Sequence, residues 1–166
     1  STVPARSQGV ELEGQWAVNQ RLDLDASATW ADAEEKASGD RLPYAPEWSA
    51  NMSLDYIYPW RSAALELRVS GAINYRDEQY QQRGETSPDN ALTMVDLRLA
   101  LASADGGWEV ALLGKNLLDE ESSFGFDFPF FVDQDIPGML YLPPGSTTIG
   151  SLNRPRTLAV QGRYSF

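Results

Sequence analysis

The chain has 166 residues and a net charge of −11, with 24 acidic against 13 basic side chains, and it contains neither cysteine nor histidine. This composition excludes disulfides, thiolate or imidazole metal ligands and a histidine-dependent serine triad. Few cations are present to neutralise phosphates, which argues against nucleic acid as a partner. No apolar run reaches the roughly 20 residues of a transmembrane helix, so any membrane crossing has to use β-strands.

Seven segments alternate apolar and polar residues with the period of two that indicates β-strands. Several run for about ten residues, which is long for a globular sheet but suits a tilted strand that crosses a bilayer. The sixth segment, WEVALLGKN, is the least regular because Ala111 and Leu113 interrupt its polar face. We predict antiparallel strands, paired in sequence order, over residues 9–18, 22–32, 48–58, 63–76, 92–102, 108–116 and 155–166.

The two faces of the predicted sheet differ in polarity. One face should carry a continuous apolar band on the convex side, which includes Leu67, Val69, Leu97, Leu99, Val110, Leu112, Leu158 and Val160. Aromatic residues near the strand ends fit either an interfacial girdle or the core of a soluble sheet, and the longer strands favour the girdle. They are Trp16, Trp30, Trp48, Tyr56, Tyr58, Trp60, Tyr75, Trp108, Tyr164 and Phe166.

The predicted connections alternate in length. Those at residues 19–21, 59–62 and 103–107 are short, whereas those at 33–47, 77–90 and 117–153 are long. Short turns on one side and long loops on the other are typical of an outer-membrane barrel, whose strand number is even in bacterial single-chain examples. Because seven is odd, we expect the chain to be part of a larger barrel, cut within an external loop, with the Pro59 and Gly106 turns on the same side as Phe166.

Three stretches, LPYAPEWSANMSLDY, WEVALLGKNLLDEE and NRPRTLAVQGRYSF, resemble the carboxy-terminal end of a TonB-dependent outer-membrane receptor. The resemblance covers essentially all of residues 1–166. It implies an all-β, antiparallel up-and-down meander that forms the last seven strands of a 22-stranded transmembrane β-barrel. The plug domain and the upstream strands would then be absent from this chain.

The same resemblance implies a function and partners. It implies active transport of a scarce nutrient, foremost a ferric siderophore, across the outer membrane of a Gram-negative cell. TonB would supply the energy through the missing amino-terminal part, and no cofactor is implied. The other partners would be outer-membrane lipid, the receptor's own plug domain, and the barrel-assembly machinery, which would read Tyr164 and Phe166 as an assembly signal.

We assign expected roles to two further groups of residues, the charged residues of the polar face and the aromatic residues of the last long loop. Charged residues of the polar face would line the lumen and contact the plug, although a solvated face of a soluble sheet has the same pattern: Glu66, Arg68, Asp96, Arg98 and Arg163. Aromatic residues of the last long loop would contact a small-molecule ligand such as an iron chelate, or would only pack a hairpin above the membrane: Phe124, Phe126, Phe128, Phe130, Phe131 and Tyr141. The nearby carboxylates match no ion-binding loop, so we predict no metal site.

Two other classes of function are compatible with the composition. A soluble β-sandwich could recognise carbohydrate or protein through the aromatic loop. An outer-membrane enzyme could use Glu120 and Glu121 as paired carboxylates, but adjacent residues of an exposed loop usually face water. We therefore predict no catalytic residue and no enzymatic activity.

Overall fold

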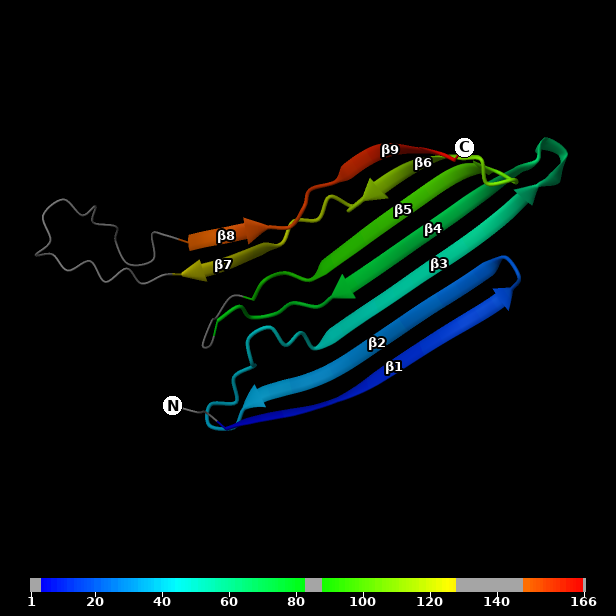
Figure 1. Ribbon diagram of the computed structural model, residues 1–166. Coiled ribbons are helices and arrows are strands. Elements are labelled where there is room, and N and C mark those ends of the chain that lie inside the picture. Colours follow the sequence, from blue (N-terminus) through cyan, green and yellow to red (C-terminus); the bar gives the residue numbers. More distant parts are fainter. Residues whose placement is uncertain (1–3, 83–87, 128–147, 166) are drawn as a thin grey trace, which may run out of the picture.

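The structure is a computed structural model that describes residues 4–82, 88–127 and 148–165, with residues 123–127 and 148–152 described as backbone. Seven strands form one antiparallel sheet in the order β1-β2-β3-β4-β5-β6-β9 (Figure 1). They are β1 (Ala5–Asn19), β2 (Leu22–Glu35), β3 (Trp48–Trp60), β4 (Leu65–Arg76), β5 (Leu92–Ser103), β6 (Trp108–Lys115) and β9 (Thr157–Tyr164). Two more strands, β7 (Ser123–Asp127) and β8 (Thr148–Leu152), pair as a separate hairpin.

The connections of the sheet differ at its two ends, as predicted. The β1–β2, β3–β4 and β5–β6 turns lie at one end, and the long connections and the β7–β8 hairpin lie at the other (Figure 1). At the turn end, a 3-10 helix (Arg61–Ala63) follows β3, and Gly106 adopts a φ of +78°, which a residue with a Cβ rarely does. The Ser165 N–H donates to the Gly107 carbonyl at 2.8 Å, so the end of β9 lies beside the Gly106 turn.

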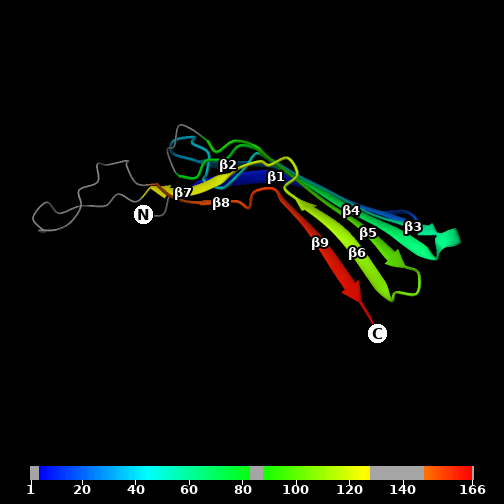
Figure 2. The same cartoon turned by 90° about the horizontal axis from the view of Figure 1, so that it is seen from above.

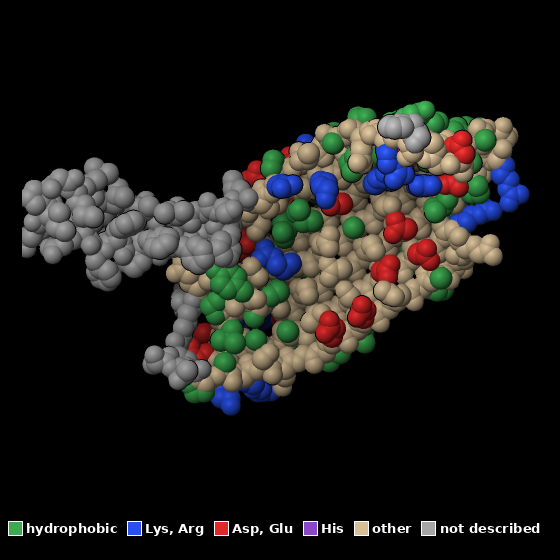
Figure 3. Space-filling model, in the orientation of Figure 1, with side chains coloured by type: hydrophobic (Ala, Val, Ile, Leu, Met, Phe, Trp, Pro, Cys, Tyr) green, Lys and Arg blue, Asp and Glu red, His purple; other side chains and the backbone are tan. Residues whose placement is uncertain are grey.

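The strand register places the predicted apolar residues on one face. Val69, Leu99, Leu112 and Val160 are successive partners across β4, β5, β6 and β9. The sheet curves so that β6 and β9 swing towards the viewer of Figure 1, and the concave face that this creates carries the acidic and basic side chains (Figures 2 and 3). The apolar band therefore lies on the convex face, and its prediction is confirmed.

The sheet has no hydrophobic core of its own among the described residues. The only buried hydrophobic side chains there are Ala100, Ala102 and Ala111, all at polar-face positions of the register. Most large apolar side chains of the convex face are exposed, from 36 % for Trp108 to 75 % for Leu158. Exposed apolar area of this extent marks a surface that another apolar phase or partner covers.

Two sequence predictions need correction. The β-sandwich alternative is wrong, because the seven long strands form one layer and, within the described residues, no second sheet packs on it. The β1 and β2 strands extend to Ala5 and Glu35, since their backbone pairing continues beyond the apolar alternation. The last long connection, for which a hairpin was one of two interpretations, contains the short β7–β8 hairpin. No helix of the described residues is long and apolar enough to span a membrane.

Candidate membrane surface, lumen face and ligand hairpin

The apolar band on the convex face has the height expected for the membrane-facing surface of an outer-membrane barrel. Its aromatic side chains gather at the two ends of the strands: Trp30 and Trp48 are cross-strand partners near the long loops, and Trp108 pairs with Tyr164 near the turns. On β3, the ten-residue step from Trp48 to Tyr58 spans about 33 Å, or about 25 Å along the membrane normal for a strand tilted by about 40°. This height equals the usual apolar band of outer-membrane barrels.

On the concave face, β4, β5 and β6 are joined by a network of ion pairs. The Glu109 carboxylate lies 3.3 Å from Arg68 Nη1 and 2.6 Å from Arg98 Nη2, and Arg68 Nη2 also lies 2.7 Å from Glu66 Oε2. Only 9 % of the Glu109 side chain is exposed. Arg163 lies opposite Glu109 in the register of β6 and β9. The network therefore brings together charges from three strands near the turn end of the sheet.

The other predicted concave-face residue, Asp96, lies nearer the long loops. Its carboxylate is 3.7 Å from Lys115 Nζ and accepts the Asn116 backbone N–H at 2.9 Å. The register thus places Glu66, Arg68, Asp96, Arg98 and Arg163 on one face. Their contact with a plug domain stays a prediction.

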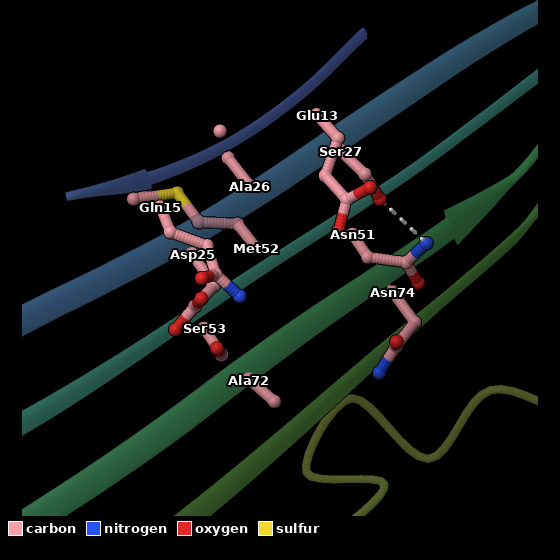
Figure 4. A pocket seen from close by; sticks show the side chains of 11 residues that line it. Glu13, Gln15, Asp25, Ala26, Ser27, Asn51, Met52, Ser53, Ala72 and Asn74 are labelled. Carbon is pink, nitrogen blue, oxygen red and sulfur yellow. Dashed lines mark hydrogen bonds between the residues drawn. The ribbon is translucent and has the colours of Figure 1, made fainter. Parts of the chain in front are cut away.

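The opposite half of the concave face is acidic and hollowed. A groove of about 320 Å³ crosses β1 to β4, lined by Glu13, Gln15, Asp25, Asn51 and Asn74 among others (Figure 4). The Asn51 amide donates to Ser27 Oγ at 3.3 Å. Within the described part of the chain, the carboxylates of this half form no ion pair: Glu11, Glu13, Asp23, Asp25 and Asp55. No group of His, Cys, Asp or Glu among the described residues is arranged to hold a metal ion.

The predicted ligand contacts fall largely outside the described residues. The backbone of β7 carries Phe124 and Phe126, which places them on the hairpin that extends beyond the loop end of the sheet (Figure 1). The others, Phe128, Phe130, Phe131 and Tyr141, lie outside the described residues, as does Phe166 of the predicted assembly signal. Tyr164 lies at the end of β9.

Asn116, which the sequence patterns above did not single out, joins the end of β6 to the segment before β9. Its side chain is 1 % exposed, and its amide donates to the carbonyls of Glu120 and Arg154 at 2.9 and 3.1 Å. Its Oδ1 accepts the Glu120 N–H at 3.0 Å, and its φ is +49°. An asparagine that ends a strand before LLDEE could have indicated this role, because asparagine tolerates the left-handed conformation.

The β2–β3 loop folds back onto the sheet through Glu47. Its carboxylate accepts hydrogen bonds from Arg41 and from Trp30 Nε1, the latter at 3.3 Å. These two donors, Arg41 first, hold the pKa of the Glu47 carboxyl below its usual value. Because a depressed pKa means that the folded loop favours the ionised form, this contact weakens as the pH falls through that pKa.

One curved antiparallel sheet with an apolar convex face, a charged concave face, short turns at one end and long loops at the other is part of a β-barrel wall. Residues 2–117 match the family model described as TonB dependent receptor-like, beta-barrel, and the chain belongs to this family. The comparison with curated proteins found no match.

The fold is also similar to a solved receptor. The chain superposes with a TM-score of 0.77 on the crystal structure of the ferric yersiniabactin uptake receptor FyuA from Yersinia pestis. The two sequences are 20 % identical, and the match covers 98 % of this chain but 24 % of FyuA. At this identity the similarity shows the fold, and the chain spans about a quarter of that receptor.

Proposed function

We propose that residues 1–166 are the carboxy-terminal part of the barrel of a TonB-dependent receptor that imports a scarce nutrient across the outer membrane. The observation that carries the proposal is the exposed apolar band, about 25 Å high, on a sheet whose described residues form no hydrophobic core. The family match supports a receptor barrel. The resemblance described above implies that the complete barrel has 22 strands. Other parts of the receptor would supply the plug domain and the TonB contact.

The concave face would line the lumen and pack against the plug. Charges on this face cost little in water, whereas the same charges towards lipid would cost about 2–4 kcal/mol each near the midplane. The ion pairs of Glu109 join β4, β5 and β6 near the turn end. The unpaired carboxylates of β1 to β3 would meet cationic groups of the plug or water. The barrel-assembly machinery would read Tyr164 and Phe166 during insertion.

The cargo that we propose first is a ferric siderophore. The family resemblance includes siderophore transport, and the similar FyuA structure is a ferric yersiniabactin uptake receptor by its title. Phe124 and Phe126 of β7, and the aromatic residues Phe128, Phe130, Phe131 and Tyr141 that follow them in the sequence, would contact such a chelate together with the plug apex. No enzymatic step is part of this function.

Uptake by intact cells tests the proposal. Deleting the gene for the full-length receptor should abolish iron-limited growth and accumulation of radiolabelled iron for one class of ferric siderophore, while leaving the other classes unchanged. The intact receptor should restore uptake, and a receptor without its TonB-contact segment should not, because it would bind ligand without energy for release. If the deletion abolished uptake of a different nutrient instead, the proposed cargo would be refuted. Unchanged uptake of every nutrient tested would refute the transport function.

A further inference from the structure

The base of the β7–β8 hairpin is tied to the rim of the sheet by four polar side chains, Arg76, Asp89, Ser122 and Asn153, which we call the hairpin clamp. Arg76 Nη2 donates to Asp89 Oδ2 at 3.0 Å and to Ser122 Oγ at 3.4 Å. Ser122 Oγ donates to the same Asp89 oxygen at 3.0 Å. The clamp therefore joins the last residue of β4, the β4–β5 loop and the residue before β7.

Both strands of the hairpin are held at this point. The Ser122 N–H donates to Asn153 Oδ1 at 2.9 Å, and the Asn153 N–H donates to the Ser122 carbonyl at 3.2 Å. Asn153 Nδ2 also donates to the Glu120 carbonyl at 2.9 Å. Ser122 precedes β7 and Asn153 follows β8, so these bonds close the base of the hairpin and attach it to Arg76.

The clamp is more protected from water than the other ion pairs at the loop end. Its Arg76 and Asp89 side chains are 22 % and 14 % exposed, whereas Arg156 and Asp119 are 51 % and 47 % exposed. Exposed pairs contribute about 0–1 kcal/mol, and pairs withdrawn from water hold their geometry more firmly when they are hydrogen-bonded. Among the described residues, Arg76 Nε is buried without a hydrogen-bond partner, and Arg76 Nη2 binds Asp89 and Ser122.

The clamp also belongs to a chain of contacts between the long loops. Gln79 and Asp89 pair through both backbone N–H groups, at 3.1 and 2.8 Å, across the base of the β4–β5 loop. The Tyr44 N–H of the β2–β3 loop donates to the Tyr80 carbonyl at 2.9 Å. Contacts with the barrel rim hold Asp89 in position, and the β2–β3 loop supports the same β4–β5 loop through Tyr80.

We propose that Arg76 is a positioning residue, which sets the direction of the β7–β8 hairpin relative to the barrel rim through Asp89 and Ser122. This inference deepens the proposed function and rests on it for the role of the hairpin in ligand binding. Arg76 acts on the ligand only through the hairpin. Removing its guanidinium should free the hairpin base while the seven-stranded sheet keeps its pairing.

Distance measurements between two spin labels in the full-length receptor test this inference. One label replaces Asp127 on β7 and the other replaces Ile73 on the convex face of β4; this chain has no native cysteine. Arg76→Met should shift the mean distance and replace the narrow distribution with a broad one, with an unchanged midpoint of unfolding in detergent. The matched control Arg156→Met removes an exposed ion pair and should leave the distribution unchanged.

Two further variants keep the test decisive. Asp89→Asn should broaden the distribution in the same way, and the charge exchange Arg76→Asp with Asp89→Arg should restore a narrow one. A narrow native distribution in Arg76→Met, or equal broadening in Arg156→Met, would overturn the inference. A broadened distribution with normal siderophore uptake would support the positioning role and refute only the ligand role of the hairpin.

Discussion

Replacing Leu99 by arginine is expected to destabilise the receptor barrel by about 2–4 kcal/mol in a lipid bilayer, because Leu99 lies in the middle of the convex apolar band. Its partners in the register, Val69 and Leu112, are also apolar. In water the same change would be nearly neutral, because the Leu99 side chain is already 38 % exposed and leaves no cavity. Denaturant titration of the refolded receptor and of the Leu99→Arg variant, both in lipid vesicles, measures the change in the free energy of unfolding.

The matched control is Ser27→Arg on the concave face. Ser27 lies opposite Glu13 and Asn51 in the register, so the added charge meets an acidic, hydrated surface. We expect a change within about 0.5 kcal/mol for this variant. Equal destabilisation by both variants, or no effect of Leu99→Arg in lipid, would contradict the assignment of the convex face to the membrane.

Replacing Asn116 by alanine is expected to destabilise the barrel by at least about 3 kcal/mol. The change takes the Asn116 partner from the part-buried Arg154 carbonyl and Glu120 N–H, and each loss costs about 1–3 kcal/mol, whereas the Glu120 carbonyl keeps its hydrogen bond from Asn153. Alanine also disfavours the φ of +49° at this position. The midpoint of denaturant unfolding in detergent measures the loss.

One variant separates the lost hydrogen bonds from the backbone strain, and a second variant is the matched control. Asn116→Gly accepts the left-handed backbone and should recover only the part of the loss that comes from backbone strain. Asn74→Ala removes an exposed amide of the concave face and should change stability by no more than about 0.5 kcal/mol. If Asn116→Ala were as mild as Asn74→Ala, the hydrogen bonds of Asn116 would not hold the β6 and β9 ends together.

The main sheet follows from the sequence because a period of two fixes which side chains share a face. Once Leu97, Leu99 and Leu101 alternate with Asp96, Arg98 and Ala100, any strand geometry separates the two sets. The strand lengths and the alternation of short and long connections then distinguish a barrel wall from a sandwich. The ends of β1 and β2 were missed because backbone pairing outside the apolar band needs no apolar side chain.

The contacts between distant segments could not be predicted in the same way. Arg68 and Glu109 are 41 residues apart, and Arg76 and Ser122 are 46 residues apart, so each contact depends on the register and on the path of the intervening loops. A hairpin was one of the two interpretations of the last long loop, but the β7 and β8 strands were not predicted because each has five residues and contains a glycine, Gly125 or Gly150, which weakens the strand signal.

The accessibility of single spin labels on the two faces tests the central claim most directly. In the full-length receptor in lipid vesicles, labels at Leu67, Leu99, Leu112 and Val160 should collide readily with oxygen dissolved in the bilayer and rarely with a water-soluble nickel chelate. Labels beyond the band, at Asp40 and Asp105 in the connections, should show the reverse. Ready collision of all four convex-face labels with the nickel chelate would contradict the account, because it would show that the apolar band faces water.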